Sequence, residues 1–254
     1  MILDGFRIYP IGCSDNTRYA GNLLKQAGFT LIDHPSPEIT HLLLDVPSFD
    51  ANGFLRDGTD LKKHLRMVPG NVTIIGGNLQ QDYIINYQTM DLLKDPYYLA
   101  KNAAITAECA LKVAAPYLKT TFSESPALIL GWGRIGKCLA RLLSALNCPV
   151  SVVARKKSDR AILEALGYRS LDFSDMIQSL DHYRILFNTV PDLTLYGNLP
   201  DSRNSIIAID LASYPGLQGD NIIPARGLPG KYAPESSGKL IADTILRLLK
   251  EETL

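Results

Sequence analysis

A Gly-x-Gly-x-x-Gly sequence that directly follows a short apolar run constrains this chain more than any other feature. Residues 127–130 (Ala-Leu-Ile-Leu) read as a buried strand, and an amphipathic stretch predicts a helix after the glycines. In such a strand–turn–helix unit, Gly131 permits the sharp turn, Gly133 lets a pyrophosphate approach the backbone, and Gly136 lets the helix pack against the strand. The amides at the helix start then face an anion. We therefore expect a dinucleotide to contact the whole turn: Gly131, Trp132, Gly133, Arg134, Ile135 and Gly136.

The residues about 20 positions beyond the glycines distinguish NAD from NADP. An NAD site usually has Asp or Glu there, which binds the ribose hydroxyls. Here the predicted strand 150–154 continues into Arg155-Lys156-Lys157-Ser158, and the first carboxylate is Asp159. Because a 2′-phosphate is anionic, Arg155 can bind it in a fork and Ser158 can donate a hydrogen bond to it. We predict NADP, bound by Arg155, Lys156 and Ser158; the alternative is a solvated basic loop.

Two later predicted strands, 184–188 and 205–210, each end in a short segment with polar residues. The first ends in Asn188-Thr189-Val190-Pro191 and the second in Asp210-Leu211-Ala212-Ser213. Ligands of open α/β sheets bind beyond the carboxyl ends of the strands, so both segments are expected beside the cofactor. The residues assigned to the cofactor on this basis are Asn188, Thr189, Val190, Pro191, Asp210, Ala212 and Ser213. For Asp210 the alternative is a loop cap.

The first 96 residues alternate between predicted strands and helices. We expect strands at 6–11, 30–33, 41–44 and 72–75, helices at 18–27 and 61–67, and a short β-like segment at 83–87. A series of this kind predicts a small parallel sheet. Gly12 is not followed by a full phosphate fingerprint, so no second nucleotide site is assigned there.

An alanine-rich helix, expected from about residue 96 to 117, connects this region to the glycine turn, since Ala is the best helix former. We therefore expect an α/β fold of two Rossmann-like, doubly wound parallel-sheet domains joined by a long helix. Residues 1–96 would form a substrate-side domain, 97–124 the linking helix, and 125–235 the NADP-binding domain. A C-terminal helix within 236–254 is expected to pack on the first domain.

The charge balance argues against nucleic acid or an anionic membrane as a partner, because 26 Lys and Arg are matched by 26 Asp and Glu. No apolar run is long enough to span a bilayer, and the N-terminus lacks the pattern of a signal peptide. Four cysteines without a Cys-x-x-Cys pair or a His cluster predict buried thiols and no metal site. We expect a cytoplasmic protein, with a homodimer as the default oligomer.

Catalytic and substrate-binding candidates lie on the long helix and near the C-terminus. Glu108 has apolar neighbours in the helix, and it is either a site residue or an exposed carboxylate. Ser236 and Ser237 begin the last predicted helix, whose free amides suit a substrate carboxylate, and Lys231 would add positive charge. The alternative for these serines is an ordinary helix cap.

Several of these segments together resemble the family of dipicolinate synthase A subunits. Residues 1–96 resemble the family loosely, and Cys109 stands where the family usually has Gly. The similar segments, which fall in order within residues 97–250, are Thr106-Ala107-Glu108, Leu130-Gly131-Trp132-Gly133-Arg134-Ile135-Gly136, Val153-Ala154-Arg155, Phe187-Asn188-Thr189-Val190-Pro191, Asp210-Leu211-Ala212-Ser213 and Gly227-Leu228-Pro229-Gly230-Lys231-Tyr232-Ala233-Pro234.

The resemblance implies a two-domain, dehydrogenase-like subunit that binds NADP and works with a flavoprotein-like second subunit. The implied reaction oxidises a dihydrodipicolinate-type cyclic dicarboxylate of the lysine pathway, in spore-forming bacteria. Gly227 and Leu228 join the cofactor-binding residues on this basis. Lys231, Ser236 and Ser237 would hold the substrate, with Thr106 or Glu108 opposite and Glu108 as the base.

Two other functions stay open at this point. One is a stand-alone NADP-dependent dehydrogenase or reductase of another small carboxylate, and the other is a non-catalytic NADP-binding subunit. The Gly-x-Gly-Arg-Ile-Gly sequence also occurs in D-2-hydroxyacid dehydrogenases, which need a catalytic His late in the nucleotide domain. The histidines here are at 34, 41, 64 and 182, and none follows Asp210, so that mechanism is not expected.

Overall fold

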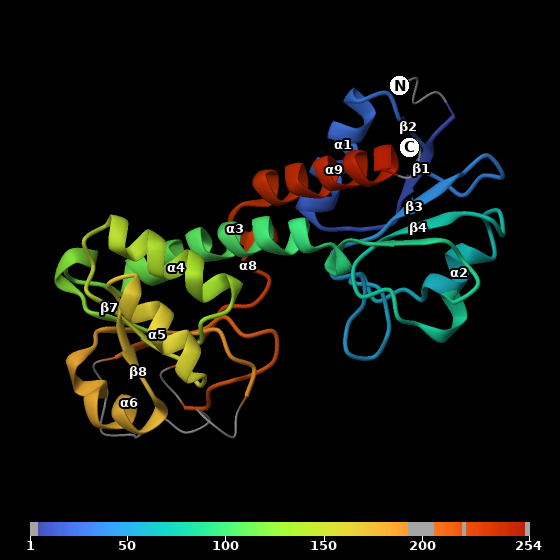
Figure 1. The fold of residues 1–254 in the computed structure, drawn as a ribbon. Coiled ribbons are helices and arrows are strands. Elements are labelled where there is room, and N and C mark those ends of the chain that lie inside the picture. Colours follow the sequence, from blue (N-terminus) through green and yellow to red (C-terminus); the bar gives the residue numbers. More distant parts are fainter. Residues whose placement is uncertain (1–4, 193–205, 220–221, 252–254) are drawn as a thin grey trace. The chain divides into compact units, whose positions relative to one another are not determined.

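The computed structural model describes residues 5–192, 206–219 and 222–251, and the chain divides into two compact units (Figure 1). Unit 1 is Met1–Asn102 with Pro229–Leu254, and unit 2 is Ala103–Leu228. The division falls within two helices, α3 (Pro96–Ala114) and α8 (Leu228–Tyr232). The domain boundaries expected from the sequence lay instead at the ends of the long helix and after residue 235.

Unit 1 is built on a parallel sheet whose strand order is β2-β1-β3-β4-β5, the 2-1-3-4-5 order of one doubly wound fold. The strands are β1 (Arg7–Pro10), β2 (Thr30–Leu31), β3 (His41–Leu43), β4 (Thr73–Gly76) and β5 (Thr89–Asp91). The helices between them are α1 (Asp15–Gln26), α2 (Leu61–Leu65) and η1 (Asp82–Ile84), and η2 (Leu92–Lys94) follows β5.

One expected element of unit 1 is wrong. The β-like segment 83–87 overlaps the short helix η1, and the fifth strand is β5, just after it. Ile84 is buried while Ile85 is exposed, which mimics the alternation of a strand although the backbone forms a helical turn. A strand of three residues carries too little periodicity to be distinguished from such a turn.

The C-terminal helix α9 (Pro234–Glu251) packs against α1 within unit 1. Gly238 allows the close approach, because a Cβ there would lie 2.5 Å from the Asn16 carbonyl oxygen. The Asn16 amide donates to the Ser237 hydroxyl at 3.2 Å, and Arg247 forms an ion pair with Asp95 at 2.7 Å. Segments from both ends of the chain therefore complete one core.

The core of unit 1 also contains a histidine that titrates far from its usual range. His41 begins β3, is 8% exposed, and its Nδ1 lies 2.7 Å from the Thr40 hydroxyl. Burial disfavours the charged imidazolium and lowers the pKa of His41 from 6.5 to about 4. In the folded protein His41 is therefore neutral at physiological pH.

The free energy of unfolding should fall as the pH drops from about 6.5 to about 4. Over this range the unfolded chain binds a proton at His41 that the folded chain excludes, which destabilises the fold by roughly 3 kcal/mol at pH 4. Urea titrations across this range should show the slope, and His41→Gln should remove most of it; burial also lowers the pKa of His64, which contributes in the same direction. The matched change at exposed His34, His34→Gln, should leave the slope in place; a parent-like slope in His41→Gln would contradict the assignment.

Unit 2 is built on a six-stranded sheet in the order β11-β10-β9-β6-β7-β8, and all of its strand pairs are parallel. Its strands are β6 (Ala127–Leu130), β7 (Val150–Val153), β8 (Arg169–Leu171), β9 (Ile185–Asn188), β10 (Ile207–Asp210) and β11 (Ile222–Pro224). Numbered within the unit, this is the 3-2-1-4-5-6 order of dinucleotide-binding folds, and β11 is a sixth strand that the sequence did not predict.

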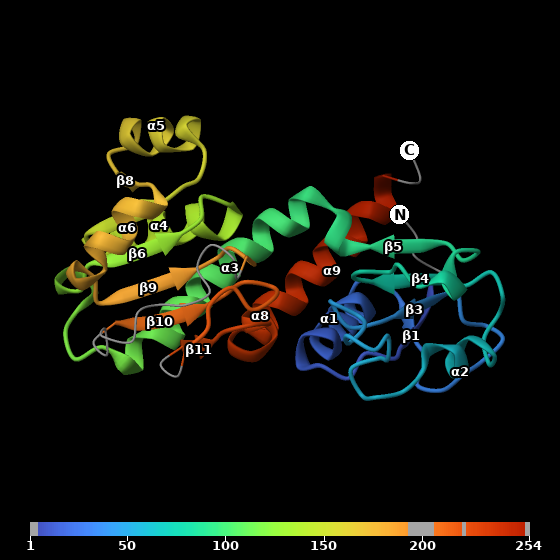
Figure 2. The same cartoon turned by 90° about the horizontal axis from the view of Figure 1, so that it is seen from below.

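The helices of unit 2 connect the strands of this sheet. They include α4 (Arg134–Ala145), α5 (Lys157–Ala165), α6 (Phe173–Ser179) and η5 (Leu180–His182). Strands β6 and β9 are buried along their whole length, as expected for a sheet covered on both faces, and Figure 2 shows β9 beside β10. The strand order reverses between β6 and β9, so ligands are expected at their carboxyl ends.

Candidate cofactor site

The glycine turn lies at this switch point, between β6 and α4. Gly131 has φ +100°, and a Cβ there would lie 2.7 Å from both the Thr189 hydroxyl and a Val190 methyl. A Cβ at Gly136 would lie 2.2 Å from the Gly131 carbonyl oxygen. Both positions therefore require glycine, as the motif predicted: Gly131 for the turn and Gly136 for close packing of the helix.

Gly133 serves a different purpose, because its surroundings are open. Its backbone is extended (φ −80°, ψ −170°), and a Cβ there would have no heavy atom within 4 Å. Gly133 is also the N-cap of α4, and no side chain caps the helix. The first amides of a 12-residue helix thus face free space, which suits a pyrophosphate.

The other residues of the turn lie around this opening. Trp132 is half-buried, and its ring packs against Tyr168 at a centroid distance of 5.9 Å. The Lys137 ammonium lies 5.7 Å from the centre of the same indole ring. Arg134 is exposed and Ile135 half-buried.

The end of β7 carries the basic loop that the sequence assigned to a 2′-phosphate. Arg155, Lys156 and Ser158 are all exposed. The Arg160 guanidinium donates to the carbonyl oxygens of Ala154 at 2.8 Å and Arg155 at 3.1 Å, which fixes the backbone of the loop. Within the described residues the Arg155 side chain has no ion pair, so its charge is available to a ligand.

Asn188 and Asp210 end the neighbouring strands β9 and β10, and they bond to each other. Asn188 is 0% and Asp210 2% exposed, and the Asn188 amide donates to Asp210 Oδ1 at 2.8 Å. The same amide donates to the Val190 carbonyl at 2.9 Å, while the Asn188 carbonyl oxygen accepts from the Val190 amide at 3.0 Å. This network holds the loop that approaches Gly131.

Both carboxylate oxygens of Asp210 are used inside the unit. Oδ1 accepts from the Ala212 amide at 3.3 Å, Oδ2 accepts from the Gly216 amide at 3.0 Å, and Arg226 lies 3.7 Å from Oδ2. The side chains of Asn188 and Asp210 are thus buried behind the loops and position them, and their contact with the cofactor stays a prediction. Asp210 as a loop cap was the alternative stated for it.

The remaining cofactor candidates differ in what they can present to a ligand. The Thr189 hydroxyl donates to the Leu130 carbonyl at 2.8 Å, which fixes Thr189 and half-buried Val190 beside the glycine turn. Ala212 and Leu228 are buried, so they shape the site through packing. The exposed members are Pro191, Ser213 and Gly227.

The catalytic and substrate candidates are divided between the two units. In unit 2, Thr106 is buried and Glu108 is exposed, because residues two apart on α3 face different directions. In unit 1, Lys231 and Ser236 are exposed. Ser237 is buried and accepts a hydrogen bond from Asn16, which joins α9 to α1, and its contact with substrate stays a prediction.

Sequence reasoning missed Asp45, which lies at the switch point of unit 1, between β1 and β3. It is 4% exposed and accepts from the backbone amides of Cys13 and Ser14, each at 3.2 Å, and from the Thr17 hydroxyl at 2.6 Å. The Ser14 hydroxyl also donates to it. A carboxylate of the chain itself thus lies at the start of α1, where a nucleotide-binding fold would hold a phosphate.

The described parts of the chain contain neither a candidate metal site nor a candidate membrane-spanning helix. No group of three or more His, Cys, Asp or Glu residues there is placed to hold a metal ion. Among the same residues, no helix is both long and apolar enough to cross a membrane.

Comparison with known proteins connects this geometry to dehydrogenases. Residues 106–193 match the family described as D-isomer specific 2-hydroxyacid dehydrogenase, NAD binding domain. This match covers the glycine turn, the basic loop and the end of β9. It concerns the nucleotide-binding domain and says nothing of a catalytic histidine.

Over most of its length the chain is similar to the A subunit of dipicolinate synthase. It is 26% identical to that protein from Bacillus subtilis (strain 168) over 258 aligned positions, which cover 88% of this chain and 86% of the relative. The crystal structure from Bacillus halodurans has a TM-score of 0.81 at 22% identity, covering 98% of this chain and 99% of that chain. The Bacillus subtilis structure has a TM-score of 0.77 at 23% identity, covering 98% and 97%. The chain is therefore a protein like the dipicolinate synthase A subunit, with a Rossmann-like, nicotinamide dinucleotide-binding dehydrogenase fold.

Proposed function

We propose that this protein is an NADP-dependent oxidoreductase subunit that oxidises a dihydrodipicolinate-type cyclic dicarboxylate by hydride transfer. The observation that carries the proposal is the open, uncapped glycine turn at the switch point of unit 2. The similarity to the A subunit of dipicolinate synthase supports the substrate class. Assembly as a homodimer, with a flavoprotein-like protein as the second subunit, belongs to the same proposal.

The choice of NADP depends on the loop after β7. Arg155 is exposed, and its guanidinium can pair with two phosphate oxygens at once. Lys156, the N-cap of α5, and Ser158, in the first turn of that helix, are exposed and would add charge and a hydroxyl donor. NAD lacks the 2′-phosphate, and an NAD site usually has a carboxylate that accepts hydrogen bonds from the ribose hydroxyls. This chain has Arg155 at that place instead.

Parent protein should bind NADPH more tightly than NADH, and Arg155→Gln should weaken NADPH binding by about tenfold or more, because a charge-assisted pair is lost. NADH binding should stay unchanged in the variant. Isothermal titration with both cofactors measures this. Arg141→Gln, at an exposed arginine on α4, is the matched control; equal affinities of the parent for the two cofactors would refute the preference.

The side chains of this protein would bind and orient the reactants. When bound, the nicotinamide ring supplies the hydride acceptor. Exposed Lys231 and Ser236 would bind the carboxylates of the substrate. Thr106, which is buried, is the second catalytic candidate beside Glu108. Aromatisation of the dihydro ring releases one hydride and one proton, and exposed Glu108 would accept that proton from a ring carbon.

The direct test is NADP reduction with freshly prepared dihydrodipicolinate, with and without the candidate second subunit. Turnover in either condition supports the proposal, and a requirement for the second subunit would establish it as a partner. Tight NADPH binding without turnover in both conditions would instead favour a non-catalytic subunit. Turnover confined to another small carboxylate would favour a stand-alone dehydrogenase.

A further inference from the structure

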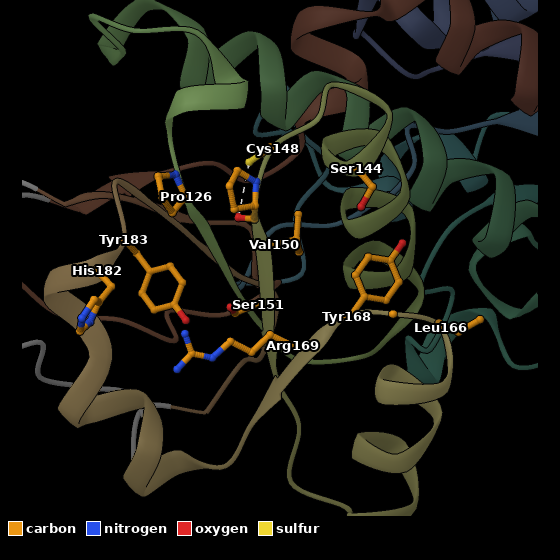
Figure 3. Close-up of a pocket in the computed structure, with 12 residues that line it drawn as sticks. Pro126, Ser144, Cys148, Val150, Ser151, Leu166, Tyr168, Arg169, His182 and Tyr183 are labelled. Carbon is orange, nitrogen blue, oxygen red and sulfur yellow. Dashed lines mark hydrogen bonds between the residues drawn. The ribbon is translucent and has the colours of Figure 1, made fainter.

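Unit 2 contains a groove at the opposite edge of its sheet from the glycine turn (Figure 3). The lining residues precede or begin the strands: Pro126 precedes β6, Val150 and Arg169 begin β7 and β8, and Tyr183 precedes β9. The groove has a volume of about 640 Å³, enough for a small organic molecule. Neither the cofactor nor the proposed reaction uses this edge.

The lining of the groove carries positive charge that is not balanced locally. Arg169 is exposed, and no Asp or Glu is among the lining residues. In the part of the chain that the structure describes, the Arg169 side chain has no ion pair. An arginine in this setting suits a carboxylate, to which its planar guanidinium can donate two hydrogen bonds.

A buried donor without a partner points to the same kind of ligand. Tyr183 lines the groove and is 4% exposed, yet its hydroxyl has no hydrogen-bond partner among the described residues. In Figure 3 the Tyr183 hydroxyl and the Arg169 guanidinium are directed toward the same part of the groove. Buried polar groups are rarely left unpaired, because an unmet donor costs about 1–3 kcal/mol. An acceptor atom on a ligand would satisfy it.

Part of the remaining lining is flat or apolar, beside Ser144, Ser151 and His182. Tyr168 contributes an aromatic ring, and Pro126, Pro149 and Leu166 contribute apolar surface. Such walls favour a ring-bearing ligand over a compact inorganic anion. We infer that this groove binds a small aromatic carboxylate, with its carboxylate at Arg169 and the Tyr183 hydroxyl and its ring against the apolar walls.

Calorimetric titration of the full-length protein with benzoate tests the inference, with NADPH kept saturating so that the cofactor site is filled. Benzoate should bind at one site per chain. Arg169→Gln should weaken binding by about tenfold or more. Tyr183→Phe should weaken it by roughly threefold to tenfold without lowering the melting temperature, since the hydroxyl has no partner in the free protein. Arg66→Gln, at an exposed arginine of unit 1, should change nothing.

Four results would overturn the inference. The first is no benzoate binding by the parent protein, and the second is binding that both groove variants retain at full strength. Benzamide binding as tightly as benzoate would exclude pairing of a carboxylate with Arg169. Inorganic phosphate binding as tightly as benzoate would exclude recognition of a ring.

Discussion

Gly133→Val should abolish measurable NADPH binding while leaving the fold nearly as stable as the parent. The backbone at Gly133 is extended, a conformation that valine adopts readily, and a Cβ there has no heavy atom within 4 Å. The isopropyl group would instead fill the space in front of the α4 amides. Binding should weaken by at least about 100-fold, since forced overpacking costs about 1–3 kcal/mol and the phosphate contacts are lost as well. The free energy of unfolding should fall by no more than about 1 kcal/mol, the cost of a poorer N-cap.

Two further glycine variants make this result specific. Gly136→Ala should destabilise unit 2 by about 3 kcal/mol or more, because its Cβ would lie 2.2 Å from a backbone oxygen that cannot move aside. Gly70→Val, at an open position of unit 1, should alter neither binding nor stability. Parent-like NADPH affinity in Gly133→Val, measured by calorimetry beside urea unfolding, would show that the cofactor does not approach this turn.

Local signals explain why much of unit 2 could be predicted from the sequence. The glycine turn requires a strand before it and a helix after it, and the structure has β6 and α4 at those places. Asp172 directly precedes α6, and its carboxylate accepts from the Asp175 amide at 3.0 Å, which is a local helix cap. Each of these features is specified within a few residues, so no distant contact is needed to recognise it.

Features that depend on distant contacts could not be predicted. Asp210 follows a buried strand, as a ligand-binding residue would, and only the fold shows that Asn188, Gly216 and Arg226 surround its carboxylate. Ser237 stands where a helix cap would bind an anion, but the packing of α9 on α1 turns it to Asn16. In both cases the residue type suits two roles, and only the tertiary structure shows which contacts the side chain makes within the chain.

Asp45 is the clearest example of this kind. In the sequence it is one aspartate after an apolar run, and its partners Cys13, Ser14 and Thr17 lie about 30 residues earlier. Burial raises the pKa of Asp45, but the hydrogen bonds from Ser14, Thr17 and Cys13 lower it, and together they hold it below its ordinary value. The carboxylate is thus charged in the folded protein and accepts from two backbone amides, two hydroxyls and the Cys13 thiol.

Asp45→Ala should therefore cost unit 1 about 3–5 kcal/mol of unfolding free energy, because it leaves two backbone amides and two hydroxyls without their acceptor at the start of α1. Asp45→Asn should cost less, since its carbonyl oxygen still accepts from some of them. Because the folded pKa is lowered, the stabilisation is present above the ordinary pKa of 3.8 and is lost as the pH falls through the folded value. The difference between the parent and Asp45→Asn should shrink below about pH 4 in urea titrations.

Asp15→Ala provides the matched control, because Asp15 is exposed in the first turn of the same helix and pairs with Arg18 on the surface. The free energy of unfolding of Asp15→Ala should fall by at most about 1 kcal/mol, as for the loss of other exposed ion pairs. If Asp45→Ala cost no more than Asp15→Ala, the donors to Asp45 would have to find water or one another, and Asp45 would not organise the turn. A large loss for Asp45→Ala alone would mean that unit 1 uses its switch point for its own stability, while the same place in unit 2 stays open for the cofactor.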